Sequence, residues 1–165
     1  MLSWQGHIVK LYLNYQKATT IDHNAPVEVI RRVVEDAARF GRFPKTVQSQ
    51  SITIDSIPAE WLIPAQVDSH SAMLYLHGGG YMAGSIKSYR ATAGQIAEAG
   101  KIRTLLIEYR LAPEHPFPAA LQDALLTYEW LQRNGYKKII IAGDSAGAGL
   151  ALRSEERRVG KECRL

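Results

Sequence analysis

The chain has 165 residues, 46% of them hydrophobic, and its 20 basic and 16 acidic residues leave a net charge of +4. This composition predicts a globular protein with a real core and excludes a disordered chain. So small a net charge does not indicate a surface that binds nucleic acid. No apolar stretch approaches the roughly 20 residues that span a bilayer, and the N-terminus is too polar for a signal peptide, so we expect a cytoplasmic protein without a membrane span.

The first 45 residues predict two helices. In residues 3–17 apolar side chains recur at three- and four-residue steps, which is typical of a helix with one apolar face. That face fits either a helix docked on the domain's own core or a lid that contacts substrate. The second helix should begin at Pro26, which suits a first helical position, and end near Gly41.

After Pro44 the pattern alternates with the period of a strand. Residues 47–54 and 59–64 predict a hairpin-like pair of strands, with a turn signalled by Asp55, Ser56 and Pro58. Residues 72–77, 103–109 and 138–143 are nearly continuous apolar runs, typical of parallel strands covered on both faces. Helical patterns at residues 87–100 and 119–135 lie between them, so the sequence predicts an α/β fold with a mostly parallel sheet.

The clearest chemical signal is the stretch Gly143-Asp144-Ser145-Ala146-Gly147, which lies between a predicted strand and small residues that can open a helix. A G-x-S-x-G sequence in that context is the nucleophile elbow, a sharp turn that exposes a strained serine. The N–H of Ala146 would then face the oxyanion that develops during acyl transfer. The alternative is a small-residue turn without chemistry.

A second signal directly follows the strand at residues 72–76. The glycines of His77-Gly78-Gly79-Gly80-Tyr81 leave backbone N–H groups unobstructed, so this loop can donate to a substrate oxygen. His77 precedes the serine, whereas the chain order in this fold is Ser, then Asp or Glu, then His. We therefore expect His77 to shape the loop rather than to act as the base.

A third stretch, residues 109–123 (YRLAPEHPFPAALQD), contains three prolines within six residues. Its spacing predicts a structural loop between a strand and a helix. His115 lies in this loop and also precedes the serine, so we expect it to be a loop residue and not the catalytic base. The histidines are isolated rather than paired at ligand spacing, so no metal site or other cofactor is expected.

Together, HGGGY at 77–81, YRLAPEHPFPAALQD at 109–123 and GDSAGA at 143–148 resemble the hormone-sensitive-lipase-like branch of the α/β-hydrolases. The resemblance runs to about Leu152. It implies an α/β-hydrolase fold with N-terminal cap helices at 1–45, the first part of the hydrolase domain at 46–152, and helices on both faces of the sheet.

The resemblance also implies an activity, that of a carboxylic-ester hydrolase acting on short acyl esters or lactones without a cofactor. Residues 58–65 (PAEWLIPA) are similar to monoterpene lactone hydrolases of this branch. The implied nucleophile is Ser145, and the implied oxyanion hole comprises Gly78, Gly79, Gly80 and Ala146, with Gly78 forming part of the turn. Three residues near the site are expected to shape its loops, namely His77, Tyr81 and Asp144. Neither substrate identity nor oligomeric state follows from the sequence.

The triad acid and base of this family lie well downstream of the serine, and all five histidines of this chain precede Ser145. Residues 153–163 (RSEERRVGKEC) resemble, codon by codon, the translation of a widely used sequencing adapter. We therefore expect residues 153–165 to be a non-native tail, and the chain to be an N-terminal fragment truncated after the elbow and inactive alone. The alternative is a genuine charged helix of a truncated relative.

Two other functional hypotheses remain open at this point. A hydrolase-fold protein can use its pocket to bind a ligand without turnover, and a downstream sequence lacking the family's histidine would favour that hypothesis. The fragment could also function alone as an interaction module, which would require it to unfold cooperatively.

Overall fold

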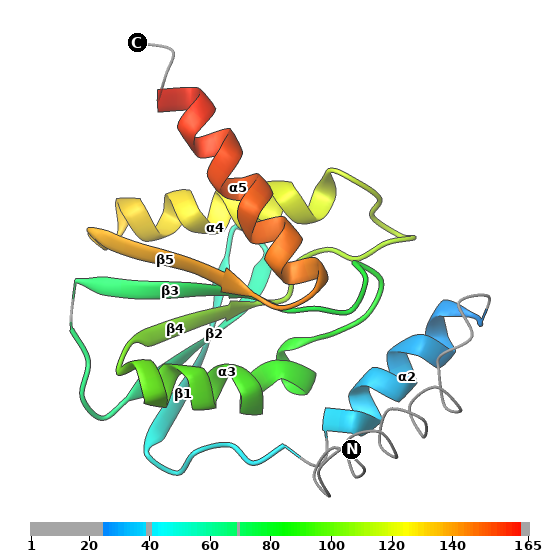
Figure 1. Cartoon of the computed structure of the whole chain (residues 1–165), viewed down its shortest axis with the longest axis horizontal. Coiled ribbons are helices and arrows are strands. Elements are labelled where there is room, and N and C mark those ends of the chain that lie inside the picture. The colour runs from blue at the N-terminus through cyan, green and yellow to red at the C-terminus, as the bar shows by residue number, and fades with distance from the viewer. Residues whose placement is uncertain (1–24, 39–40, 69, 163–165) are drawn as a thin grey trace, which may run out of the picture.

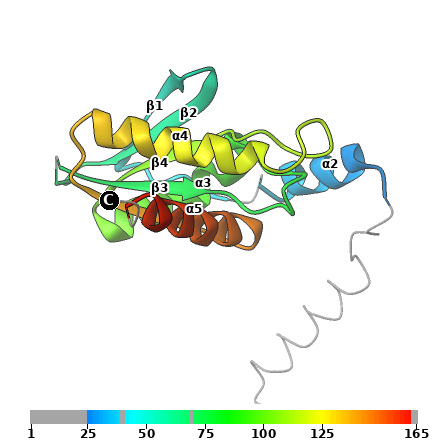
Figure 2. The ribbon, with the colours of Figure 1, turned by 90° about the horizontal axis from the view of Figure 1, so that it is seen from above.

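A computed structural model describes residues 25–38, 41–68 and 70–162, with side chains described as far as Ser154. The predicted helix within residues 3–17 lies outside these residues. The second predicted helix is present as α2 (Val27–Ala37), which follows Pro26. α2 lies at the end of the molecule where the loops after the central strands gather (Figure 1), and the view from above places it at that same end (Figure 2).

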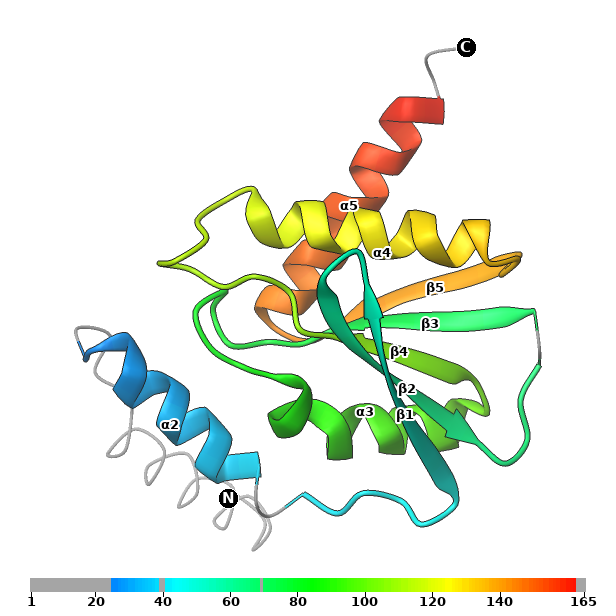
Figure 3. The same ribbon diagram turned by 180° about the vertical axis from the view of Figure 1, so that it is seen from behind.

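The first two strands form the predicted hairpin, a twisted ribbon at one edge of the sheet (Figure 3). β1 (Val47–Ile54) pairs antiparallel with β2 (Ile57–Pro64). The expectation that Pro58 belongs to the turn is wrong, because Pro58 lies within β2 opposite Thr53. Asp55 and Ser56 both have positive φ, and two such residues suffice for a hairpin turn that matches the strand twist.

The sheet has the strand order β1-β2-β4-β3-β5. β3 (Ser71–Leu76) lies between β4 (Arg103–Ile107) and β5 (Lys138–Gly143) and is parallel to both, whereas β2 is antiparallel to β4. Only β2 therefore opposes the common direction, which confirms the mostly parallel sheet. In the described part of the chain β5 is paired on one side only, and its Ile140 is exposed.

Three helices cover the sheet: α3 (Ile86–Gly100), α4 (Ala119–Arg133) and α5 (Ala146–Glu162). Successive side chains of each buried strand point to opposite faces of the sheet and therefore belong to two separate cores. Leu74 and Leu105 pack in one core with residues of α4 and α5, and Met73 and Leu106 pack in the other with residues of α3. Helices on both faces of the sheet are thus confirmed.

The proline-rich loop (residues 109–118) is held by an ion pair between Asp123 of α4 and Arg110, whose side chain is 43% exposed. Asp123 is almost fully buried. Its carboxylate accepts two kinds of hydrogen bond from Arg110, one from the backbone N–H at 2.8 Å and one from the guanidinium at 2.7 Å. A buried carboxylate without these donors would be costly, so this pair fixes the loop relative to α4. The prediction of a structural loop agrees with this arrangement.

Candidate active site

The turn between β5 and α5, which we call the elbow (Gly143–Gly147), holds Ser145 at a φ of 49°. A non-glycine residue in this left-handed region costs about 1–2 kcal/mol, and such strain persists only where the surroundings enforce it. Here the neighbouring glycines allow close packing: a Cβ at Gly143 would lie 2.4 Å from the carbonyl oxygen of Leu76, and one at Gly147 would lie 1.9 Å from it. The elbow is therefore pressed against the end of β3.

Ser145 itself is exposed and directly precedes α5, which begins at Ala146. Its hydroxyl forms no hydrogen bond within the part of the chain that the structure describes. The first N–H groups of a helix have no intrahelical acceptor and carry a partial positive charge. Negative charge that develops beside Ser145 would thus be stabilised by the start of α5.

The loop after β3, which we call the glycine loop (His77–Ala83), runs beside the elbow. Gly79, Gly80 and Tyr81 have φ values of 117°, 64° and 62°, so the backbone is left-handed over three residues. The carbonyl of Gly79 accepts the N–H groups of Met82 and Ala83 at 3.1 and 2.9 Å. Within the described residues the N–H groups of Gly79 and Gly80 have no acceptor, so both can serve a ligand.

Gly78 differs from the two glycines that follow it. Its N–H donates to Asp144 Oδ1 at 3.0 Å, and its backbone is buried. A donor already held by a carboxylate is not available to an oxyanion. We therefore correct the expectation that Gly78 belongs to the oxyanion hole, and assign it to the turn alone.

Asp144 connects the elbow to the glycine loop and to two tyrosines. Besides the N–H of Gly78, its carboxylate accepts the hydroxyls of Tyr75 and Tyr89, each at 3.1 Å. Burial, with the nearby carboxylate, raises the pKa of Tyr75 and raises the pKa of Tyr89 to about 12. Both phenols thus keep the protons that they donate. Sequence reasoning missed these tyrosines, although a tyrosine within the apolar run of β3 was a signal.

This network predicts a measurable contribution to stability. We expect Asp144→Ala to lower the free energy of unfolding by about 2 kcal/mol, because it leaves three partly buried donors without their acceptor. Tyr75→Phe and Tyr89→Phe should each cost about 1 kcal/mol. Urea unfolding followed by tryptophan fluorescence measures these values, with Tyr81→Phe, at an exposed tyrosine, as the control. An unchanged midpoint in Asp144→Ala would contradict the connecting role.

His77 is fully buried between Tyr109 and Tyr89, with ring centroids 4.2 and 5.3 Å away. Its Nδ1 lies 2.8 Å from the carbonyl oxygen of Gly78, which can only accept, so Nδ1 carries the proton. Burial lowers the pKa of His77, which keeps the ring neutral. Its backbone oxygen accepts the hydroxyl of Tyr109 at 2.6 Å. These contacts suit a residue that shapes the loop.

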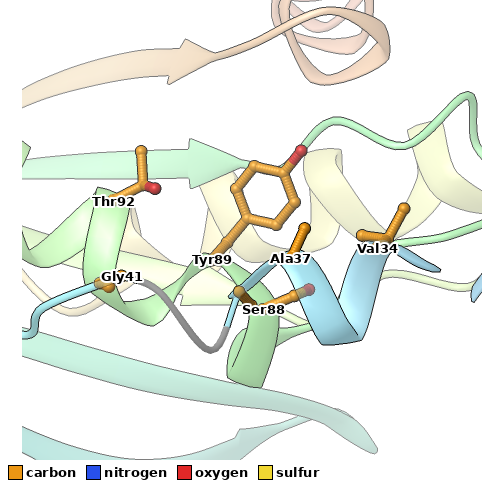
Figure 4. A pocket seen from close by; sticks show the side chains of 8 residues that line it. Val34, Ala37, Gly41, Ser88, Tyr89 and Thr92 are labelled. Carbon is orange, nitrogen blue, oxygen red and sulfur yellow. The ribbon is translucent and has the colours of Figure 1, made fainter. Parts of the chain in front are cut away.

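Two cavities flank this region. One of about 550 Å³ is lined by Gly80, Tyr81, His115 and Leu150 among others, and His115 is exposed there. The second, of about 370 Å³, lies between α2 and α3, where Val34 and Ala37 face Ser88 and Tyr89 (Figure 4). Within the described residues no group of three or more acidic, histidine or cysteine side chains could hold a metal ion. The helices in the same part of the chain lack the length and the apolar character of a membrane span.

Comparison with known proteins identifies the fold family of the chain. Residues 73–160 match the family model of the alpha/beta hydrolase fold. The chain is 40% identical over 126 residues to an acetyl-hydrolase of Streptomyces hygroscopicus, covering 74% of this chain and 42% of that protein. It is 31% identical over 151 residues to an esterase of Acinetobacter venetianus, covering 90% of this chain and 50% of that protein. The chain thus spans about half the length of these curated relatives.

Solved structures give the same result. A crystal structure of an esterase/lipase from an uncultured bacterium superimposes with a TM-score of 0.82 at 39% identity, covering 93% of this chain and 53% of that one. An esterase from the bacterial hormone-sensitive lipase family superimposes with a TM-score of 0.79 at 34% identity, covering 88% of this chain and 50% of that one. The chain therefore belongs to the α/β-hydrolase fold family, in its hormone-sensitive-lipase-like branch.

Proposed function

We propose that this chain carries the nucleophile and the oxyanion hole of a serine carboxylic-ester hydrolase. The observation that supports this most directly is Ser145, exposed and left-handed at the start of α5, beside a glycine loop with free N–H groups. Simple turns do not require a strained serine, whereas a nucleophile elbow does. In the proposed reaction the Oγ of Ser145 attacks the ester carbonyl and forms a tetrahedral intermediate.

The negative charge of that intermediate resides on the former carbonyl oxygen. We assign the N–H groups of Gly79, Gly80 and Ala146 as its donors, since preorganised donors stabilise the transition state more than the substrate. Collapse of the intermediate breaks the bond to the alcohol oxygen, which takes up the proton that a general base received from Ser145, and leaves an acyl group on Ser145. The base then takes a proton from water, which attacks the acyl group, and that proton returns to the Oγ of Ser145 as the carboxylic acid leaves.

A base must take the proton of Ser145, and we propose that it and its orienting acid lie outside these 165 residues. The enclosed ring of His77 is unsuited to this role, because its Nδ1 donates to Gly78 and its pKa is lowered by burial. A chain without the base would retain only the residual catalysis that an oxyanion hole and binding provide. We therefore expect the chain alone to be nearly inactive.

The proposed substrates are esters of short carboxylic acids, or lactones. Relatives of this chain bear the names acetyl-hydrolase, in Streptomyces hygroscopicus, and ethyl acetate hydrolase, in Pseudomonas putida. Crystals of a related protein, EstE5, were soaked with p-nitrophenyl butyrate. These names support short acyl groups and leave the alcohol unassigned.

The test compares two proteins from the same source. The source gene is first read across the codons for Leu150 to Arg153, and the whole protein that it encodes is produced beside the 165-residue chain. We expect a frame that continues past Leu152 to a downstream Asp and His, and a whole protein that hydrolyses p-nitrophenyl acetate and butyrate. Hydrolysis by neither protein, with an intact downstream triad, would contradict the proposal. A replaced downstream histidine would favour ligand binding without turnover.

A further inference from the structure

α2 is attached to the rest of the domain without burying a side chain. None of its residues is buried, and Val29 and Val33 are 49% and 45% exposed. Hydrophobic burial, the usual means of attaching a helix, is therefore weak here. The attachment instead involves Arg31 and Glu35, which lie four residues apart on one face of the helix. Glu35 accepts the hydroxyl of Ser85, the N-cap of α3.

Arg31 makes contacts with two separate loops. Its Nε donates to the carbonyl oxygen of Met82 in the glycine loop at 2.8 Å, and its Nη2 donates to that of Ala112 at 3.1 Å. The outer edge of the same guanidinium forms a bidentate pair with Glu114, at 2.8 and 2.7 Å. One rigid, planar group thus fixes the distance between residues 82 and 112–114.

These contacts continue toward the proposed oxyanion donors. The N–H of Ala112 donates to the carbonyl of Tyr81 at 2.8 Å. The glycine loop is therefore bonded to the proline-rich loop at Tyr81, directly before Met82, whose carbonyl accepts from Arg31. The N–H of Met82 in turn donates to the carbonyl of Gly79. The carbonyl of Gly79 and the N–H of Gly80 belong to the same planar peptide group. A series of hydrogen bonds therefore joins the guanidinium of Arg31 to the peptide group that sets the direction of the Gly80 N–H.

We propose that Arg31 is a positioning residue, which acts through the carbonyl groups of Met82 and Ala112 to hold the glycine loop in its donor conformation. The loop is left-handed over Gly79, Gly80 and Tyr81, a conformation that persists only where bonds within the loop and to its surroundings enforce it. α2 is then more than a cover, because it carries the group that orders the oxyanion hole. The catalytic consequence rests on the proposed function, whereas the order of the loop does not.

A variant of Glu114 distinguishes a positioning role of Arg31 from that of an ordinary ion pair. The hydrogen bond from Arg31 lowers the pKa of Glu114 to about 2, so the carboxylate is ionised down to strongly acidic pH. Yet the pair is exposed, and exposed ion pairs contribute little. Glu114→Gln removes the charge of this partner and leaves both carbonyl contacts of Arg31 possible. The proposal therefore predicts a large effect of Arg31→Gln and a small effect of Glu114→Gln.

Hydrogen exchange of the 165-residue chain tests the order of the loop without any activity. We expect the amides of Met82, Ala83 and Ala112 to exchange at least about tenfold faster in Arg31→Gln than in the wild type. Glu114→Gln, and Arg32→Gln as a matched loss of charge on the same helix, should leave these amides nearly unchanged. The amides of β4 serve as the internal control for global unfolding.

Arg31→Lys keeps the charge but loses the fork, so it should behave like Arg31→Gln. Wild-type protection of the loop in either variant would overturn the proposal, and so would equal effects of Arg31→Gln and Glu114→Gln. In the whole protein we expect Arg31→Gln to lower kcat about 10- to 100-fold with little change in KM, since misplaced donors affect the transition state. A change in KM alone would make Arg31 a substrate-pocket residue. An inactive wild type would count against the proposed function, and the exchange result would still decide the role of Arg31.

Discussion

Replacement of Ser145 by alanine is expected to lower the kcat of the whole protein by at least about 10⁴-fold, the largest effect on activity that we predict. The reason is that the acyl-enzyme cannot form without the Oγ, while the donors of Gly79, Gly80 and Ala146 remain. Alanine tolerates the left-handed φ of 49° about as poorly as serine does, so the free energy of unfolding should change little. Initial rates with p-nitrophenyl acetate measure the first effect, and urea unfolding measures the second.

Covalent labelling identifies the nucleophile independently of rate. A fluorophosphonate should add to Ser145 of the whole protein, and the tryptic peptide that carries the label identifies the residue by mass spectrometry. Ser51→Ala, at an exposed position of β1, is the matched control and should label as the wild type does. A label on any other serine, or activity retained in Ser145→Ala, would contradict the assignment of the nucleophile.

The sequence predicted the central sheet well, because burial and strand direction have local signatures. The apolar runs at 72–77 and 103–109 correspond to β3 and β4 with boundaries shifted by one or two residues, and the run at 138–143 coincides with β5. Pro58 is of a turn-forming residue type, yet it lies in β2 because the two positive φ values of Asp55 and Ser56 already complete the turn.

The site was predicted less completely, because its contacts join residues far apart in the chain. The motif placed Ser145 and the glycines, but it did not show that Gly78 gives its N–H to Asp144, 66 residues away. Arg31 likewise bonds to Met82, 51 residues away, and no pattern in the sequence singles this arginine out. Periodicity indicates which face of a helix is used, and it does not identify the partner on the other side.

The assignment of residues 153–165 to a non-native tail stays a prediction. α5 is continuous across the Leu152–Arg153 junction, and the hydroxyl of Ser154 donates to the carbonyl of Leu150 at 2.8 Å. A helix that has started on GAGLAL can extend into any sequence without strong helix breakers, since each added residue needs only one further bond. Helical structure therefore says little about where these residues came from, and the source gene decides.

Replacement of Gly147 by alanine is expected to have the largest effect on the fold of the elbow. An added Cβ would lie 1.9 Å from the carbonyl oxygen of Leu76 and 2.6 Å from that of His77, and both are backbone atoms that cannot swing away. α5 would have to move away from β3, taking the elbow with it. We expect a loss of about 3 kcal/mol in the free energy of unfolding and a loss of activity of at least about 100-fold.

Gly149, two residues further along α5, provides the matched control for this variant. Its added Cβ would meet only the hydroxyl of Tyr81 at 2.9 Å, the free end of an exposed side chain that can rotate aside. Alanine also favours a helix over glycine by about 1 kcal/mol, so Gly149→Ala should be neutral or slightly stabilising. If both variants unfold at the wild-type urea concentration, the close contact between the elbow and β3 does not exist. If Gly147→Ala loses activity while keeping its stability, the contact positions Ser145 and contributes little to the fold. Such a separation is possible because a displacement of about 1 Å of a reacting group can lower the rate about 100-fold.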